Sequence, residues 1–250
     1  MRAYQWGMER PVYERMRSLE RTHWWFVGRR RILSRLIGDL GLPPEARLLE
    51  AGCGVGGNIE MLRQFGALEA LEPDGPSRDY IRDRYDLTPA SGRLPDELPY
   101  DPESFDAIFA LDVVEHVQED AAAVSALARL LRPGGLLLLT VPAYDWMWSA
   151  HDERHHHKRR YTRARVEALF AQAGLGCVRA SYFNTLLFAP AALVRGLKRL
   201  LRLTGEDDAL PPAPVNSVMR ALFSAEAHWL RRASLPFGLS ILGVARREAA

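Results

Sequence analysis

The residues with the clearest chemical meaning are a carboxylate and the glycines that follow it in the run EAGCGVGG, residues 50–57. Gly52, Gly54 and Gly57 satisfy the G-x-G-x-x-G spacing, in which glycines let the backbone turn tightly and approach a bound ligand closely. That spacing alone is compatible with a dinucleotide. Glu50, however, would repel a pyrophosphate and would attract a ligand that carries an ammonium group and a sulfonium. The run therefore indicates a cofactor site and favours a cationic cofactor.

A second carboxylate, Glu72, follows Gly52 by twenty residues and ends a short apolar run, 68–72. At the end of a strand, a carboxylate in this position can accept hydrogen bonds from both hydroxyls of a ribose. Ribose occurs in S-adenosylmethionine and in NAD, so Glu72 does not distinguish between them. Glu50 therefore favours S-adenosylmethionine as the cofactor, with NAD as the alternative.

Histidines gather in two places where acid–base chemistry is expected. His116 comes one turn after a predicted strand, and a second group, residues 151–157, lies in the polar loop after the next strand. A reacting hydroxyl or carbon acid has to lose a proton, and histidine accepts one near neutral pH. The candidates for this base are His116, His151 and His157, with a packing role as the alternative for His116. No metal ion is expected, because the three adjacent histidines 155–157 cannot all point one way.

Two further groups are candidates for holding the second substrate. Arg160 and Tyr161 end the histidine loop, and an arginine suits a carboxylate or a phosphate. The run HWWF, residues 23–26, precedes the predicted sheet. It is interpreted either as a lid that excludes water or as an aromatic staple for the N-terminal helix. The acceptor contacts assigned to this run are His23, Trp24 and Trp25.

The elements that must position these residues alternate between strands and helices. Apolar runs predict strands at 47–51, 68–72, 87–91, 105–111 and 136–141, with helical patterns between them. Two later strands are predicted at 176–183 and 239–246. Such alternation predicts a parallel sheet with helices on both faces, whose ligands bind at the carboxyl ends of the strands. Residues 46–183 and 237–247 are therefore assigned to one Rossmann-like, doubly wound α/β core.

Two helical segments lie outside that core. Residues 1–45 are interpreted as an aromatic-rich lid. Residues 184–236 form an insertion before the last strand, in which Arg195 and Arg199 alternate with leucines and valines. Such a helix either caps the acceptor pocket or lies in the interface of an anionic membrane.

Composition bounds the remaining questions. The chain has 250 residues and a net charge of +2, which is too mild to argue for a nucleic acid partner. Its two cysteines, Cys53 and Cys177, form neither a disulfide framework nor a zinc spacing, and no apolar signal segment opens the chain. These features predict a cytoplasmic protein that reaches at most the inner surface of the membrane. The oligomeric state is left open.

Four ordered motifs resemble those of class I S-adenosylmethionine-dependent methyltransferases, over about residues 46–142. They are LLEAGCGVGG, LEALEPDG, LPYDPESFDAIFALDVVEHV and LARLLRPGGLLLLTVP. The outer runs are similar to a narrower bacterial group found alongside cell-surface glycan and lipid biosynthesis enzymes, and more distantly to ubiquinone-type methyltransferases. These outer runs are THWWFVGRRRI and HDERHHHKRRYTRARVEALFAQAGL.

The resemblance implies a seven-stranded sheet whose last strand, here 239–246, runs antiparallel. It also implies where the cofactor lies. The residues placed around it are Glu50, Gly52 and Gly54 for the methionine part, Glu72, Pro73 and Asp74 for the ribose, Arg93 and Leu94 for the adenine, and Leu111 and Asp112 beside the fourth strand.

The expected function is therefore methyl transfer from S-adenosylmethionine to a small-molecule, glycan or lipid-linked acceptor. Two alternatives remain at this point. One is an NAD-dependent oxidoreductase, and the other is an S-adenosylmethionine-binding module that does not catalyse a reaction.

Overall fold

A single six-stranded sheet lies at the centre of the computed structural model, which describes residues 10–201 and 210–249. The strand order is β2-β1-β3-β4-β6-β5. Neighbouring strands from β2 to β4 are parallel, and β6 runs antiparallel to both β4 and β5. The strands are β1 (Arg47–Ala51), β2 (Ala67–Leu71), β3 (Phe105–Leu111), β4 (Leu131–Pro142), β5 (Leu175–Phe183) and β6 (Ser240–Arg247).

The Rossmann-like α/β core and its antiparallel last strand are confirmed, but the expected seventh strand at 87–91 is wrong. Within the described residues, that segment forms one isolated bridge, between Ala90 and Leu71 of β2. The Ala90 amide donates to the Ala70 carbonyl at 2.8 Å, and its carbonyl accepts from the Glu72 amide at 3.1 Å. The neighbouring Pro89 has no N–H to donate, so the pairing does not extend through it.

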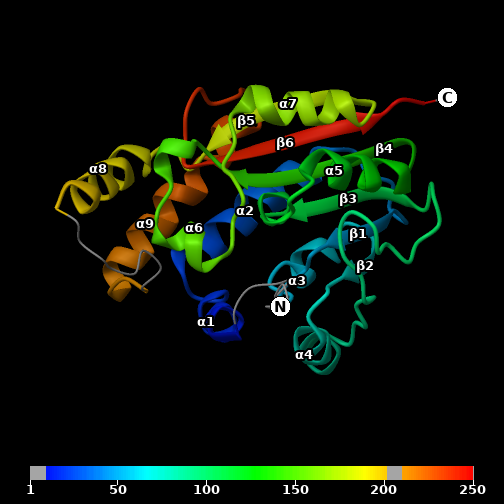
Figure 1. Ribbon diagram of the computed structural model, residues 1–250, viewed down its shortest axis with the longest axis horizontal. Coiled ribbons are helices and arrows are strands. Elements are labelled where there is room, and N and C mark those ends of the chain that lie inside the picture. The colour runs from blue at the N-terminus through cyan, green and yellow to red at the C-terminus, as the bar shows by residue number, and fades with distance from the viewer. Residues whose placement is uncertain (1–9, 202–209, 250) are drawn as a thin grey trace, which may run out of the picture.

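Helices cover both faces of this sheet (Figure 1). Because side chains alternate along a strand, Leu137 and Leu139 of β4 pack under α5 and α7, whereas Leu136 and Leu138 face the helices of the opposite layer. The helices described are α1 (Arg10–Leu19), α2 (Trp24–Gly38), α3 (Ile59–Leu62), α4 (Gly75–Tyr85), α5 (Asp120–Leu130), α6 (Ala150–Arg154), α7 (Arg163–Gln172), α8 (Phe188–Leu200), α9 (Ala213–Ala225) and α10 (Ala227–Leu230).

The N-terminal segment consists of two helices with different surroundings. Helix α2 is part of a sheet-covering layer, because Ile32, Leu33 and Leu36 are buried in the same core cluster as the strands. Helix α1 instead lies over the glycine-rich loop, where Tyr13 reaches Glu72. The lid expected for residues 1–45 is therefore best sought in α1, and residues 1–9 lie outside the described part of the chain.

The insertion at 184–236 packs against the N-terminal segment. Asn216 of α9 joins the two, since its side chain accepts from the Trp24 amide at 2.8 Å and donates to the Thr22 carbonyl at 2.9 Å. Phe223 of α9 sits directly over Gly28 of α2, where no larger residue would fit. The carboxyl ends of the parallel strands point toward this assembly of α1, α6, α8 and α9 (Figure 1).

Candidate active site

The glycine-rich loop between β1 and α3 has the geometry that its sequence predicts. Gly52 and Gly54 adopt left-handed backbone angles, with φ of 73° and 58°. A Cβ on Gly52 would lie 2.7 Å from a methyl carbon of Val113, so only glycine permits this approach to the loop after β3. The Gly52 amide also donates to the carbonyl of Leu71 at 2.8 Å, which holds the loop against the end of β2.

Glu50 is buried at the carboxyl end of β1, and one of its two carboxylate oxygens accepts a hydrogen bond. Its Oε1 accepts from the Asn58 side-chain amide at 2.8 Å. Its Oε2 is buried and has no hydrogen-bond partner among the described residues. Burial raises the pKa of Glu50 to about 8, because the charged form loses its hydration. An unpartnered carboxylate oxygen of this kind fits the ammonium group of a methionine moiety.

Glu72 lies at the end of β2 and is also buried. Its carboxylate accepts from the Gly54 amide at 2.8 Å and from the Asp74 amide at 3.0 Å. The Tyr13 hydroxyl of α1 donates to Glu72 Oε1 at 3.3 Å. Burial raises the pKa of Glu72 to about 7. A carboxylate that already binds one hydroxyl is suited to the hydroxyls of a ribose, so the residues present fit the expected cofactor.

A salt bridge between Asp112 and Arg29 lies at the carboxyl end of β3. Asp112 follows β3 with a φ of 58°, accepts from the Thr140 hydroxyl at 3.1 Å and forms a salt bridge with Arg29. Arg29 is only 5% exposed, and its guanidinium lies over the Trp25 ring at 4.5 Å. Burial lowers the pKa of Arg29 to about 10. A buried guanidinium beside Glu50 and Asp112 is suited to the carboxylate of a methionine moiety.

Arg29 was missed by sequence reasoning, although a signal for it was present. The run 29–31 reads as a solvated basic helix face. Arg29, however, precedes Ile32, Leu33 and Leu36 by three, four and seven residues, which places it on the apolar face of α2. A charge at such a position is buried and needs a partner, and Asp112 is that partner.

The residues expected near the adenine and beside the ribose have other contacts. Asp74 caps α4 by accepting from the Ser77 amide at 2.9 Å, and it pairs with Arg10 at 3.2 Å. Arg93 pairs with Glu97 at 3.2 Å. Leu94 is buried in the core cluster that contains Leu71. Cofactor contacts of Pro73, Asp74, Arg93 and Leu94, and of Leu111 beside Asp112, remain proposals.

The predicted acceptor residues are held by structural contacts. Arg160 forms a buried two-point ion pair with Asp152, both N–O distances being 2.8 Å, and donates to the Ala143 carbonyl at 3.1 Å. The Tyr161 hydroxyl donates to Asp120 at 3.1 Å, and the ring is buried. The proposed anion contact of these two residues therefore has no support, because an anion would have to displace buried partners.

The aromatic run at 23–26 begins α2. The His23 side chain accepts from the Trp25 amide at 3.3 Å and so caps the helix. The Trp24 ring meets Phe223 edge-on with 5.7 Å between centroids. These contacts support the aromatic staple, while Trp25 reaches the active site through its stacking on Arg29.

The histidines of the loop after β4 come together near the end of β3. The His157 and His116 rings meet at 4.7 Å between centroids. His157 Nδ1 lies 2.8 Å from Asp152 Oδ1, which holds that nitrogen as the donor and leaves a lone pair on Nε2. Burial lowers the pKa of both His116 and His157, so the neutral rings are favoured. Such a lone pair can accept a proton or bind a metal ion.

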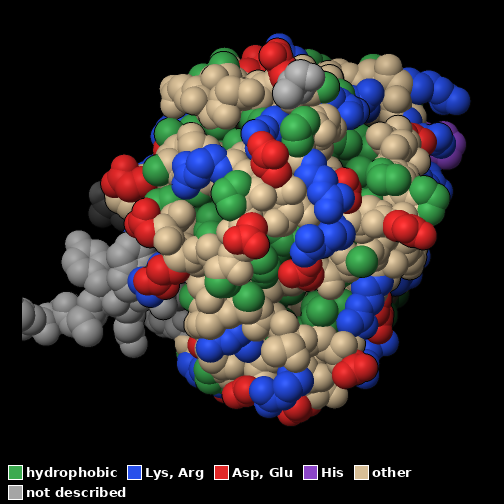
Figure 2. Space-filling model, turned by 90° about the vertical axis from the view of Figure 1, so that its right-hand side faces the viewer, with side chains coloured by type: hydrophobic (Ala, Val, Ile, Leu, Met, Phe, Trp, Pro, Cys, Tyr) green, Lys and Arg blue, Asp and Glu red, His purple; other side chains and the backbone are tan. Residues whose placement is uncertain are grey.

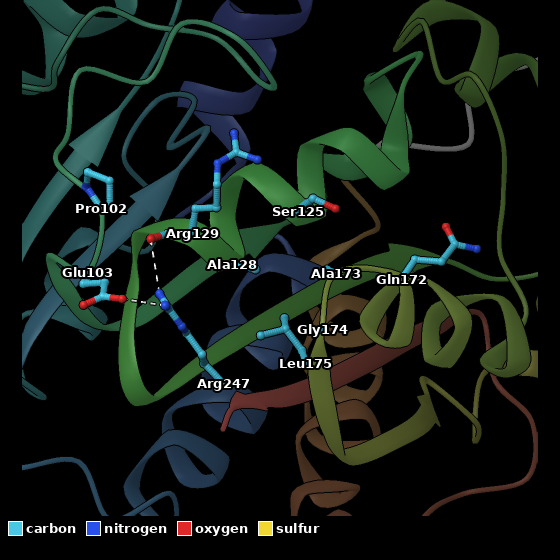
Figure 3. A pocket seen from close by; sticks show the side chains of 10 residues that line it. All are labelled: Pro102, Glu103, Ser125, Ala128, Arg129, Gln172, Ala173, Gly174, Leu175 and Arg247. Atoms are coloured by element: carbon cyan, nitrogen blue, oxygen red, sulfur yellow. Dashed lines mark hydrogen bonds and ion pairs between the residues drawn. The ribbon is translucent and has the colours of Figure 1, made fainter. Parts of the chain in front are cut away.

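A separate hollow of about 390 Å³ lies at the opposite end of the sheet, between β6 and the helices α5 and α7 (Figure 3). Arg247 crosses it to Glu103, at 2.5 Å. Acidic and basic side chains are interspersed over this side of the molecule (Figure 2). The hollow faces the amino ends of the parallel strands, so it is far from the carboxylates of the candidate site.

Comparisons with known proteins agree with this geometry. A family model described as a methyltransferase domain matches residues 25–180. The chain is 33% identical over 117 residues to 27-O-demethylrifamycin SV methyltransferase of Amycolatopsis mediterranei, covering 44% of this chain and 43% of that protein. It is 31% identical over 103 residues to a ubiquinone biosynthesis O-methyltransferase of Xanthomonas campestris, covering 39% and 43%. The chain therefore spans about two fifths of the length of these relatives.

Solved structures show the same fold. The chain superposes on a chain of the Haloferax volcanii complex between the Trm112 methyltransferase activator and a methyltransferase with a TM-score of 0.63. The two chains are 19% identical, and 96% of each is covered. None of the matches described above supports the oxidoreductase alternative. The family match spans more than half of the chain and includes β1, the glycine loop, Glu72 and Asp112. The chain belongs to the class I S-adenosylmethionine-dependent methyltransferases.

Proposed function

We propose that the protein transfers the methyl group of S-adenosylmethionine to an acceptor carried on a lipid or a comparable apolar chain. The bound cofactor supplies an electrophilic methyl group, and the protein has to align the acceptor with it. Glu50 and Arg29 would bind the methionine end, and Glu72 the ribose. The observation that carries the acceptor class is the apolar surface next to this site, on α8 and α9.

An aromatic group leads from the sheet to that surface. Tyr144 follows β4 and stacks on Tyr182 of β5, with 5.1 Å between centroids. The Phe188 ring at the start of α8 packs against three other aromatic rings. The distances between ring centroids are 5.8 Å to Tyr144, 6.1 Å to Trp146 and 5.5 Å to Phe237. Aromatic faces of this kind accommodate hydrocarbon chains and sugar rings alike, so a glycan on a lipid carrier is compatible with them.

Two exposed apolar stripes extend the aromatic group. Leu193 and Leu197 of α8, and Leu201 directly after it, recur every four residues, and Leu193 is 64% exposed. On α9, Val215, Val218 and Leu222 lie on one face. Exposed large apolar side chains at such spacing are typical of surfaces that bind apolar partners or a membrane interface. The stripes support peripheral contact with a lipid surface, and the basic residues that the sequence has in this segment favour an anionic one.

The name of one relative favours an oxygen atom as the methyl acceptor. The Xanthomonas campestris protein is named as a ubiquinone biosynthesis O-methyltransferase. Among the described residues no helix has the length and apolar character needed to cross a membrane. The exposed stripes of α8 and α9 are the proposed route to an acceptor on a lipid.

The test is methyl transfer from radiolabelled S-adenosylmethionine to lipid extracts presented in anionic vesicles. The double variant Leu193→Ser/Leu197→Ser should lose at least tenfold in activity toward vesicles and should sediment less with them, while its cofactor affinity stays unchanged. The control is Val178→Ser, because Val178 is 53% exposed but lies on β5, outside the stripes. Equal transfer by all three proteins, or transfer to water-soluble acceptors alone, would refute the lipid-linked class.

The non-catalytic alternative is decided by the same assay. A module that binds S-adenosylmethionine without turnover would give calorimetric binding and no transferred label with any lipid or sugar acceptor. Detected transfer that depends on Glu72 would exclude it.

A further inference from the structure

Three histidines converge at the end of α6, beside the candidate active site. His151 and His155 are four residues apart, and their rings stack with 4.0 Å between centroids. The His157 ring lies 5.7 Å from that of His151 and 5.8 Å from that of His155. One ring nitrogen from each of the three falls within 4.8 Å of the other two. The spacing of the first two, i and i+4 on a helix, puts both on one face.

The backbone at His156 explains how adjacent histidines can share a target. His156 has a φ of 55°, in the left-handed region that residues with a Cβ rarely adopt. This turn reverses the chain, so His155 and His157 both approach His151 while His156 itself is exposed. The prediction that the adjacent histidines 155–157 cannot all point one way is compatible with this turn, because only His155 and His157 approach His151.

A buried carboxylate orients the third histidine. Asp152 Oδ1 lies 2.8 Å from His157 Nδ1, so Nε2 is the nitrogen available on the other edge of the ring. Asp152 is fixed in turn by the two-point ion pair with Arg160 and by the Ser149 amide at 2.8 Å. A carboxylate that holds the second nitrogen of a histidine is the usual outer contact of a metal ligand.

The geometry assigns a divalent transition-metal site to His151, His155 and His157. Three neutral imidazoles with an open fourth position form a known zinc ligand set. Two nitrogens that share one zinc ion lie about 3.4 Å apart, so the ring nitrogens would have to close in by at most about 1.4 Å per pair. A second arrangement, Glu115, His116 and His157, shares the last ligand and is the competing site.

The three-histidine set is favoured because two of its members lie on one helical face and the third is oriented by Asp152. His116 instead packs against the loop that carries the ligands, since its ring meets that of His157 at 4.7 Å between centroids. Val113, one turn before His116, touches Gly52 of the cofactor loop. An open metal position here would lie on the acceptor side of the site, where it can bind and acidify a hydroxyl. Metal binding itself does not rest on the proposed acceptor.

The experiment is titration of the metal-free full-length protein with Zn²⁺ by calorimetry, and with Co²⁺ by visible absorption. The wild type should bind one Zn²⁺ with micromolar or tighter affinity and should give the intense visible bands of low-coordinate Co²⁺. His151→Ala and His155→Ala should each weaken Zn²⁺ binding at least tenfold. The matched control is His156→Gly, which removes the neighbouring imidazole and keeps the left-handed turn, so its affinity should stay within twofold of the wild type.

Three outcomes would overturn the assignment. They are no Zn²⁺ binding by the wild type below about 100 μM, an equal loss in His156→Gly, or a loss in His116→Gln that His151→Ala and His155→Ala do not show. The last result would move the ion to the competing site. Retained S-adenosylmethionine binding by each variant shows that it is folded, because the cofactor residues lie on other elements. Failure of the methyltransfer proposal would leave these metal titrations unaffected.

Discussion

Glu50 and Glu72 are carboxylates that the fold buries side by side at the ends of β1 and β2. Burial raises their pKa values to about 8 and about 7, so the ligand-free site is reluctant to hold both charges. A cationic ligand compensates for that cost, whereas a pyrophosphate would increase it. We therefore expect the buried carboxylate pair to favour a ligand that carries an ammonium and a sulfonium over one that carries a pyrophosphate.

Replacing Glu50 by Gln should stabilise the ligand-free protein at alkaline pH. An unfolded glutamate has a pKa of about 4.3. The folded protein holds the proton more tightly, so the stability that Glu50 contributes falls as the pH rises toward and through about 8. Glu50→Gln should raise the free energy of unfolding at pH 8.5 by a few kcal/mol, about 1.4 kcal/mol for each unit between the two pKa values, and leave it unchanged at pH 4, below both of them.

Urea denaturation at the two pH values measures this effect, with Glu60→Gln as the control because Glu60 is exposed on α3. The same Glu50→Gln protein should bind S-adenosylmethionine about tenfold more weakly. A pH-independent stability change, or unchanged cofactor affinity, would contradict the role given to this carboxylate.

Spacing alone predicted both carboxylates, because their positions depend on short segments of chain next to the strands. The contacts of Arg160 and Tyr161 depended on packing between segments far apart in sequence. Tyr161, for example, reaches Asp120 across 41 residues. Their types suit anion binding, yet the sequence does not show that buried partners already take up their polar atoms.

Helix α1 is the element that stands between the cofactor site and solvent. The Tyr13 hydroxyl donates a hydrogen bond to Glu72, and the Met16 side chain lies near Gly54. The Arg17 guanidinium lies over the Tyr80 ring, 4.2 Å from its centroid. A ribose that binds Glu72 has to take over the hydrogen bond that the Tyr13 hydroxyl makes. We infer that α1 moves or repacks when the cofactor enters, as a lid does.

Replacing Tyr13 by Phe should therefore tighten cofactor binding. The change removes a competing hydrogen bond, whose net contribution is about 1 kcal/mol. That difference corresponds to about fivefold in the dissociation constant of S-adenosylmethionine, measured by calorimetry. Tyr80→Phe on α4 is the matched control and should leave the affinity unchanged. Weaker binding by Tyr13→Phe would mean instead that the hydroxyl helps to hold the cofactor.

Strand positions were the most predictable elements. The ranges 47–51 and 105–111 match β1 and β3, because these strands are buried on both faces and read as continuous apolar runs. The segment 87–91 lies at the edge of the sheet and pairs only with β2. Pro89 has no N–H to donate, so the backbone pairing stops there, and the apolar composition of the segment wrongly predicted a full strand.

At the scale of the whole molecule, the two outer segments form one assembly at the carboxyl ends of the strands. The sequence predicts 1–45 and 184–236 as separate units, because no local pattern links residues nearly two hundred positions apart. Asn216 supplies that link through the Thr22 carbonyl and the Trp24 amide. The assembly beside the candidate site is thus built from segments far apart in the sequence.

Replacing Asn216 by Ala should loosen that assembly. Each of its two partly buried hydrogen bonds contributes about 0.5–1.5 kcal/mol, so the free energy of unfolding should fall by about 1–3 kcal/mol. Ser217→Ala is the control, because Ser217 is exposed on the same helix. Equal denaturation midpoints for the two variants would show that the segments are held together by other contacts.

The central claim is that Glu50 and Glu72 bind S-adenosylmethionine, and calorimetry on the wild type and the Glu72→Ala variant tests it most directly. The wild type should bind S-adenosylmethionine one-to-one and give no heat with NAD. Glu72→Ala should bind at least tenfold more weakly, because the ribose loses its acceptor. Binding of NAD but not of S-adenosylmethionine, or equal affinity of the two proteins for S-adenosylmethionine, would contradict the account.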